Sequence, residues 1–201
     1  MNQAEIKTFI DGYQNRRERT IVIVDFSNVE KWKKSLGWKI GIQELSRLVR
    51  NFSIGQQYLR RFYYGSDYGP KERSVTLTAW SAEILHRASM NRFEVVTKRV
   101  KYIHDKNGSY EKKCDLDVEM TVDLIRERDN YDQAVIFSGD GDLVYAMRYL
   151  HDNFGKNFIV FGARGHTGSE VQDAPNEGIV SRILYADDFE YRLNMDRFRR
   201  R

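Results

Sequence analysis

Five aspartates lie in three short segments of the chain, and their type and spacing suit metal chemistry. Asp25 ends an apolar run, Asp115 and Asp117 follow a pair of lysines, and Asp140 and Asp142 follow a second apolar run. Carboxylates that share one crevice repel one another unless a cation neutralises them or some of them hold a proton. Hard oxygen ligands select Mg²⁺ or Mn²⁺, so the pattern indicates a site for one of these ions.

Zinc chemistry fits the sequence poorly, because zinc prefers histidine and cysteine ligands. The chain has one cysteine and four scattered histidines, without zinc-ligand spacing: Cys114, His86, His104, His151 and His166. Helix capping is a simpler role for Asp115, Asp140 and Asp142, since aspartate is favoured where a helix begins. Capping does not account for Asp25, which we expect at the end of a buried strand.

Other polar side chains accompany the acids. Asn28 follows the first aspartate in the same loop, and Ser138 precedes the third acidic segment. Asp123 lies six positions after Asp117, a rotation of about 120° on a helix, so the two need not face one cation. We therefore expect Asp117 to be the better metal ligand, and Asp123 to be partly buried and to orient another group.

The strands that must position these residues follow from apolar patterning. Continuous apolar runs rich in β-branched residues predict strands covered on both faces, as in a parallel sheet. These runs are residues 21–26, 134–137 and 158–161. Residues 57–64 and 93–103 are further candidate strands, and Asn107-Gly108 predicts a turn at 105–109.

Helices are expected between the strands. The candidates are residues 45–52, 74–85 with Ser74 as N-cap, 115–128, which we expect protein to surround on much of its surface, and 142–153. The alternation predicts an α/β fold, a three-layer α/β/α sandwich with a central, mainly parallel sheet and right-handed crossovers. Ligands of such sheets bind beyond the carboxyl ends of the strands, so Asp25 and Asp140 converge if their strands are central neighbours.

Length and composition bound the class of protein. The 201 residues fit one domain, residues 1–201, with a core at about 20–190, an N-terminal helix and a basic C-terminal tail. The single cysteine excludes a disulfide within the chain and favours a reducing compartment, so we expect a cytoplasmic protein. No apolar run of about 18 residues occurs, and the first residues lack the apolar stretch of a signal peptide, so we expect no membrane span.

The charge distribution is consistent with a polyanionic partner. The net charge of +4 is mild, but residues 87–113 hold eight Lys/Arg against three acids, and residues 192–201 hold five arginines against one acid. Such stretches could follow a phosphate backbone, although a solvated face explains them equally well. Candidate phosphate contacts are Lys98, Arg99, Lys101, Lys112, Lys113 and, in a glycine-rich loop at 162–168, Arg164.

Other signals are weaker. The glycine-rich loop lacks the spacing of a dinucleotide fingerprint, and neither a P-loop nor a serine nucleophile elbow occurs. Residues 60–64 (RRFYY) mix basic and aromatic side chains as RNA-contacting strands do, but a strand with core aromatics is the better interpretation. Trp32 and Trp38 could belong to the core, cover the crevice or face a partner, and the oligomeric state, a dimer included, is open.

Three segments together resemble the NYN domain, a branch of the PIN-like nuclease superfamily: Ile-Val-Asp25-Phe-Ser-Asn28, Lys113-Cys-Asp115-Leu-Asp117 with Asp123, and Phe-Ser138-Gly-Asp140-Gly-Asp142-Leu. Each motif alone is weak, but the three in this order across residues 20–161 are fairly specific. The stretch after residue 161 resembles the closing strand and helix of the family only loosely. The resemblance implies a Rossmann-like, PIN-like α/β/α fold whose acidic crevice binds a divalent metal and cleaves RNA.

The resemblance also implies roles for particular residues. Carried onto this chain, the core metal ligands are Asp25, Asp117 and Asp140. Asp142, a further ligand, and Asn28 complete the catalytic site, whereas Asp115, Asp123 and Ser138 are candidate supporting residues. The basic residues named above would contact RNA, single-stranded or structured, and the cofactor would be Mg²⁺ or Mn²⁺.

Two other functions stay open at this point. A binding module would grip RNA or a nucleotide through the metal without cleaving it. A metal-dependent phosphatase of small molecules would need Asp25 as a free nucleophile.

Overall fold

A six-stranded sheet forms the centre of the computed structural model, which describes residues 1–14, 18–52, 60–71, 74–104 and 109–196. Neighbouring strands all pair in parallel, in the order β3-β2-β1-β6-β7-β8. The strands are β1 (Thr20–Asp25), β2 (Arg60–Tyr63), β3 (Glu94–Val96), β6 (Gln133–Phe137), β7 (Asn157–Gly162) and β8 (Val180–Tyr185). The predicted parallel sheet is confirmed.

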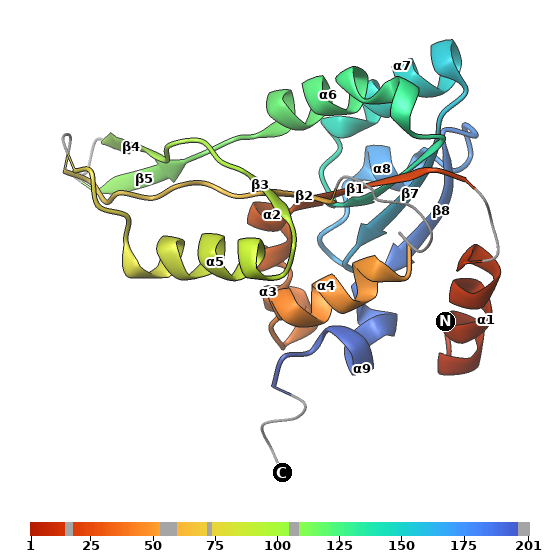
Figure 1. Cartoon of the computed structure of the whole chain (residues 1–201), viewed down its shortest axis with the longest axis horizontal. Coiled ribbons are helices and arrows are strands. Elements are labelled where there is room, and N and C mark those ends of the chain that lie inside the picture. The colour runs from red at the N-terminus through yellow and green to blue at the C-terminus, as the bar shows by residue number, and fades with distance from the viewer. Residues whose placement is uncertain (15–17, 53–59, 72–73, 105–108, 197–201) are drawn as a thin grey trace.

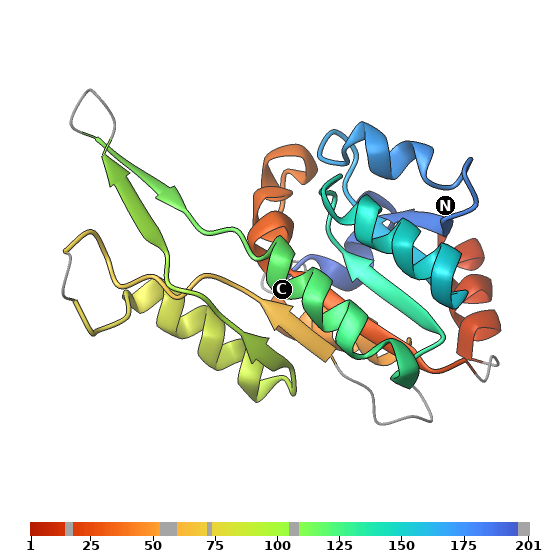
Figure 2. The same ribbon diagram turned by 90° about the horizontal axis from the view of Figure 1, so that it is seen from above.

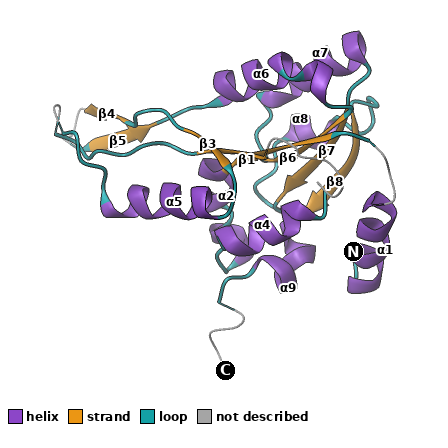
Figure 3. Ribbon diagram, viewed as in Figure 1, coloured by secondary structure: helices purple, strands orange, loops and turns teal. Residues whose placement is uncertain are grey.

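Helices cover both faces of the sheet and complete a three-layer α/β/α sandwich (Figure 1). One face carries α1 (Gln3–Gln14), α2 (Phe26–Lys31), α3 (Lys33–Leu36), α4 (Ile42–Arg50), α5 (Ala79–Met90) and α9 (Glu190–Leu193). The other face carries α6 (Asp117–Arg126), α7 (Leu143–Phe154) and α8 (Ser169–Asp173). Figure 3 shows the same layers by secondary structure, and the predicted fold class is confirmed.

Alternate residues of β1 enter two hydrophobic clusters. Val22 and Val24 pack on the face covered by α4, whereas Ile21 and Ile23 pack on the face covered by α6 and α7. All four side chains are at most 1% exposed, and burial of each aliphatic side chain contributes about 1.5–3 kcal/mol. The strand is therefore held from both sides, which fixes the position of the aspartate at its end.

The strand order reverses between β1 and β6. These strands are adjacent, with Val24 paired to Phe137. From β1 the sheet grows through β2 to β3, and it then resumes on the other side of β1 with β6. Such a switch point opens a crevice at the carboxyl ends of the strands. The prediction that these two strands are central neighbours is confirmed.

An antiparallel hairpin, which we call the hairpin arm, extends away from the sheet (Figures 1 and 2). It consists of β4 (Lys101–His104) and β5 (Tyr110–Lys113). The prediction of one strand at 93–103 was wrong, because β3 belongs to the sheet whereas β4 pairs only in the arm. The valines of β3 are half-buried and most of β4 is exposed, so the two strands face different surroundings. Of the predicted turn at 105–109, only Ser109 lies within the described residues.

Helix α5 differs from its prediction at its start and in its buried face. Its N-cap is Thr78, whose hydroxyl accepts a hydrogen bond from the Ser81 N–H at 3.4 Å, and not Ser74. Trp80, one of the apolar residues at helical spacing in this segment, is 57% exposed. The helix instead buries the face around Ile84.

Helix α6 is less enclosed than its apolar pattern predicted. Val118 and Val122 are 69% and 44% exposed. Met120 and Leu124 form the buried face, which packs against the sheet together with α7. One side of the helix is therefore free of protein.

The tryptophans after β1 belong to the core. Trp32 is 1% exposed, and Trp38 is half-buried against the same cluster. In β2, Phe62 and Tyr63 are also buried, which confirms the core interpretation of residues 60–64; residues 57–59 of that predicted strand lie outside the described residues. Among the described residues, no helix has the length and apolar character needed to span a membrane.

Candidate active-site cleft

A cleft of about 220 Å³ lies at the carboxyl ends of β1 and β6, at the switch point of the sheet. Its lining residues come from the end of β1, from α2, which starts directly after β1, from the loop that follows β6 and from the segment that opens α6. They are Asp25, Ser27, Asn28, Lys31, Cys114, Asp115, Leu116, Asp117, Asp140 and Asp142. The structure thus brings together the five aspartates that the sequence singled out.

Asp25 is the most buried of these acids, at 6% exposed. Its Oδ1 accepts a hydrogen bond from the Asn28 N–H at 3.0 Å, and its Oδ2 accepts one from the Ser138 hydroxyl at 3.1 Å. Burial raises the pKa of this carboxyl to about 6, against the two hydrogen bonds, which lower it. Because α2 starts at the next residue, Asp25 is also its N-cap, so the expectation that capping does not apply here was wrong.

Asn28 joins α2 to the acidic loop that follows β6. The sequence argument placed Asn28 in a loop after the strand, but it lies on α2, which starts directly after β1. Its Oδ1 accepts hydrogen bonds from the Trp32 Nε1–H at 2.8 Å and from the Gly139 N–H at 3.1 Å. A Cβ on Gly139 would lie 2.2 Å from the carbonyl oxygen of His166, so this position needs glycine for close packing.

Asp115 and Asp117 act as a pair where α6 begins. The Asp117 N–H donates to Asp115 Oδ1 at 2.9 Å, and this bond holds the pKa of Asp115 below its usual value. Burial raises the pKa of Asp117 to about 7, and the Asp115 carboxylate and the charges of Asp140 and Asp25 raise it further. The three acidic segments therefore interact electrostatically across the cleft.

Asp140 and Asp142 lie in the loop before α7. The Asp140 N–H donates to the Ser138 hydroxyl at 3.2 Å, and the Asp142 N–H donates to Asp140 Oδ1 at 3.1 Å. Asp142 occupies the N-cap position of α7 but makes no side-chain capping bond. The Ser138 hydroxyl also donates to the carboxylate of Asp25, so Ser138 links this loop to the end of β1.

The donor set suits a hard divalent cation. All the acidic groups present oxygen, and burial and repulsion raise the pKa of two of them, a cost that a cation would offset. Burial also raises the pKa of the Cys114 thiol, which disfavours a thiolate ligand. In the described part of the chain, however, no group of three or more His, Cys, Asp or Glu side chains is arranged to hold a metal ion. The aspartates share a cleft without forming an assembled coordination shell.

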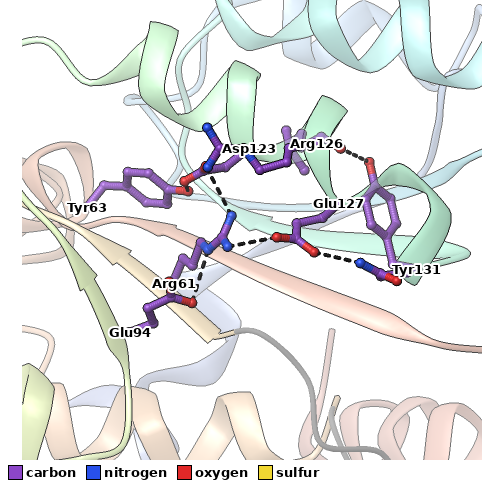
Figure 4. Close-up of polar contacts among 9 residues, drawn as sticks. Arg61, Tyr63, Glu94, Asp123, Arg126, Glu127 and Tyr131 are labelled. Carbon is purple, nitrogen blue, oxygen red and sulfur yellow. Dashed lines mark hydrogen bonds and ion pairs between the residues drawn. The ribbon is translucent and has the colours of Figure 1, made fainter.

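Asp123 does not line this cleft. Its carboxylate accepts hydrogen bonds from the Tyr63 hydroxyl at 2.8 Å and from Arg126 at 3.1 Å, and it pairs with Arg61 at 3.2 Å (Figure 4). The expectation of a partly buried residue that orients something else fits this placement, but its candidacy as a supporting residue of the cleft does not. Asp123 orients β2 by contacting Arg61 and Tyr63, two side chains of that strand.

Arg61 is the centre of this buried network. Besides Asp123, it binds Glu94 at 3.2 Å and Glu127 at 2.9 Å (Figure 4). The Nη1 atom of Arg61 forms an ion pair with Asp123 but makes no hydrogen bond. The network ties β2 and β3 to α6, so it helps to set where the first turn of α6 meets the cleft.

Four of the six basic residues proposed as phosphate contacts already have protein partners. Lys98 pairs with Glu119, Lys112 with Asp67, Arg164 with Asp188 through both guanidinium nitrogens, and Arg99 donates to the Ser74 carbonyl. Lys101 and Lys113 are exposed on the hairpin arm and pair with no acid in the described part of the chain. These two lysines are therefore the better candidates for phosphate contact.

Lys31 is a cleft residue that the sequence argument missed. It lies on α2 three positions after Asn28, and its charge lowers the pKa of Asp25. The signal was present in the sequence, since side chains three apart on a helix share a face. A cation beside the acids gives the cleft one fixed positive charge.

A parallel sheet with an acidic cleft at its switch point defines a PIN-like domain. The sequence model of the NYN domain matches residues 19–184, and the chain belongs to this family. The match extends beyond residue 161, where the resemblance was only loose, and includes most of β8.

Two further proteins are similar to this chain. A stretch of 60 residues is 40% identical to the low amplitude and bright protein LabA of Synechococcus elongatus, and it covers 29% of this chain and 32% of LabA. The chain thus matches about a third of the length of that relative. The crystal structure of a protein of unknown function from Vibrio parahaemolyticus has the same fold, with a TM-score of 0.62 and 19% identity over 87% of this chain and 96% of the other.

Proposed function

We propose that this protein is a metal-dependent ribonuclease that hydrolyses RNA phosphodiester bonds in the cleft. The observation that carries the proposal is the convergence of five aspartates at the switch point of a NYN domain. Asp25, Asp117, Asp140 and Asp142 would hold Mg²⁺ or Mn²⁺ through their carboxylate oxygens. A bound divalent cation offsets charge on the phosphate and makes water easier to deprotonate.

The residues around the acids would hold the site in shape. Ser138 and the Asn28 N–H fix both oxygens of Asp25, so its carboxylate has one orientation. Asn28 holds α2 against the loop after β6. Asp115 orients the first turn of α6 through its bond to the Asp117 N–H. These contacts limit how far the acids can separate when charged substrate enters.

RNA would reach the cleft along the hairpin arm. β5 ends at Lys113, one residue before the cleft-lining segment that starts at Cys114, so the arm and the acids are joined directly. Lys101 and Lys113 would neutralise phosphates on this path.

Non-cleaving binding of RNA or a nucleotide through a metal ion is the second candidate function. It is favoured by the arrangement of the aspartates, which share the cleft although, among the described residues, no three acidic, histidine or cysteine side chains are arranged around an ion. A small-molecule phosphatase has less support, because both oxygens of Asp25 accept hydrogen bonds and its carboxylate is therefore not a free nucleophile.

One assay separates the two candidates. A fluorescently labelled single-stranded RNA is incubated with the purified protein in Mn²⁺, in Mg²⁺ or in EDTA, and both bound complex and cleaved product are measured. The ribonuclease proposal expects cleavage in at least one metal and none in EDTA. Intact RNA that is bound in Mn²⁺ or Mg²⁺ would establish the binding module instead.

A further inference from the structure

A second cavity, of about 320 Å³, lies on the opposite side of α2 from the acidic cleft. Helices α2, α4 and α5 surround it, all on one face of the sheet (Figure 1). Phe26, Ile42 and Ile84 line it with buried apolar side chains. Neither the acidic cleft nor the hairpin arm shares a residue with this cavity, so the proposed function does not account for it.

Trp80 stands at the rim of this cavity as an exposed but anchored aromatic ring. Its side chain is 57% exposed, although tryptophan usually buries most of its surface. The indole Nε1–H donates to Glu30 Oε1 at 3.2 Å, and the Tyr64 hydroxyl donates to Glu30 Oε2 at 3.0 Å. An exposed ring held in place by a fixed acceptor offers a flat surface on which a planar group can stack.

The charges around the cavity favour an anionic ligand. Glu30 accepts hydrogen bonds from the neutral donors Trp80 and Tyr64 and keeps its charge, whereas Glu83 pairs with Arg87; three bases against two acids leave the lining with a net charge of +1. Lys33 and Lys39 also line the cavity, are exposed and pair with no acid in the described part of the chain. A planar aromatic group beside an anion is the chemistry of a nucleotide, whereas an apolar peptide would leave both lysines unmatched.

Helix α2 relates the cavity to the acidic cleft. Phe26 and Glu30 face the cavity, whereas Ser27, Asn28 and Lys31 face the cleft. A helix with its side chains is about 10–12 Å across. A stacked strand advances about 3.4 Å per nucleotide, so about three nucleotides span the width of α2, which separates the cavity from the cleft.

We propose that this cavity, which we call the Trp80 pocket, binds one base of single-stranded RNA by stacking on Trp80. Lys33 and Lys39 contact the phosphates that flank this base. The base lies about three nucleotides from the bond that is cleaved, a register that rests on the proposed function. Base binding itself does not depend on metal or on cleavage.

Binding of a fluorescein-labelled 12-nucleotide single-stranded RNA to the full chain in EDTA tests the pocket without cleavage. Trp80→Ala is expected to weaken binding about tenfold, because loss of one stacked base has an effect of this order. Trp80→Phe keeps a ring and should stay within about threefold of the wild type. Tyr145→Ala, which removes an aromatic ring that is 81% exposed on α7, is the matched control and should bind as the wild type does.

A second measurement locates the base. Each position of the RNA is replaced in turn by an abasic nucleotide, and the wild type should lose about tenfold in affinity at one position. In Trp80→Ala, an abasic nucleotide at that position should cause no further loss of affinity, because this variant has already lost the stacking contact. An unchanged affinity of Trp80→Ala, or an abasic effect equally large in this variant, would overturn the proposal. So would an effect of Trp80→Ala on self-association but not on RNA binding.

The outcomes distinguish this proposal from the ribonuclease proposal. If RNA stays intact with metal but Trp80→Ala weakens its binding in EDTA, the Trp80 pocket stands and the cleavage chemistry fails. If the protein cleaves RNA and Trp80→Ala neither weakens binding nor changes cleavage, the pocket fails alone. Equal thermal unfolding midpoints of the variants and the wild type exclude loss of fold as the cause.

Discussion

The side-chain oxygen of Asn28 accepts a hydrogen bond from the backbone N–H of Gly139 at 3.1 Å. This bond joins α2, which starts directly after β1, to the loop that follows β6, although the residues are 111 positions apart. The same oxygen accepts from the indole of Trp32, a core residue. One amide therefore fixes α2 and the acidic loop after β6 to each other and to the hydrophobic core.

Asn28→Ala removes this shared acceptor and leaves two donors without a partner. An unsatisfied buried donor costs about 1–3 kcal/mol, so we expect a loss of stability in that range. We also expect cleavage to fall, because α2 and the acidic loop after β6 are no longer tied together. Urea unfolding and the RNA cleavage assay measure both effects. Wild-type stability in this variant would show that the amide does not hold α2 to this loop.

Asp25→Asn tests the burial of the central carboxyl. In the folded protein this pKa is raised from 3.8 to about 6, so the native state binds more protons than the unfolded chain between about pH 4 and pH 6. Native stability therefore falls as pH rises through this window, and the charged form is disfavoured above it. Asparagine carries no charge, so Asp25→Asn avoids the free-energy cost of a charged carboxylate at this buried position.

We therefore expect the stability gain of Asp25→Asn over the wild type to grow by about 2 kcal/mol from pH 4.5 to pH 7.5. Urea unfolding in EDTA at the two pH values measures it. Asp152→Asn changes an exposed carboxyl on α7 and is the matched control, for which the difference should be flat. A gain for Asp25→Asn that is the same at both pH values would show that its carboxyl titrates normally.

Arg61→Met tests the network that anchors α6. The substitution removes the buried cation that Asp123 and Glu127 share and leaves Asp123 with only the exposed Arg126, and breaking a buried pair in this way costs about 3–5 kcal/mol. Arg148→Met breaks a pair with Glu177 in which both side chains are more than 40% exposed, and it should cost at most about 1 kcal/mol. Similar losses in the two variants would mean that the network around Arg61 contributes no more than a surface pair.

The exposed lysines of the hairpin arm should control the salt dependence of RNA binding. Each phosphate contact adds nearly one unit to the slope of log affinity against log salt, about 0.7 for a single strand. The double variant Lys101→Gln, Lys113→Gln should therefore reduce the slope by about 1–2 units. Lys7→Gln on α1 is the control and should leave it unchanged. A slope that does not change in the double variant would remove the arm from the RNA path.

The strands around the cleft were predictable, because β1, β6 and β7 are continuous apolar runs buried on both faces. The division of residues 93–103 between β3 and the arm was not predictable from the sequence. Both parts have β-forming residues, and they differ only in the strands with which they pair. The convergence of Asp25 and Asp140 followed from topology, as the carboxyl ends of neighbouring parallel strands meet.

Partners distant in sequence were out of reach of local patterns. Asp123 could be placed on a helix face, but its partner Arg61 lies 62 positions earlier in the chain. Likewise, the charge of Lys112 was visible, but not its pairing with Asp67 on another segment. The exposure of Trp80 was missed for the same reason, because helical spacing does not say which face meets the sheet.

The most direct test of the central claim is the single-turnover rate of RNA cleavage in Mn²⁺ by the wild type, Asp25→Asn, Asp140→Asn and the Asp152→Asn control. All four proteins are purified in the same way and checked for folding. The account predicts that the wild type and Asp152→Asn cleave at the same rate, and that Asp25→Asn and Asp140→Asn are slower by at least about a hundredfold. Equal rates for all four proteins, or no cleavage by the folded wild type, would contradict it.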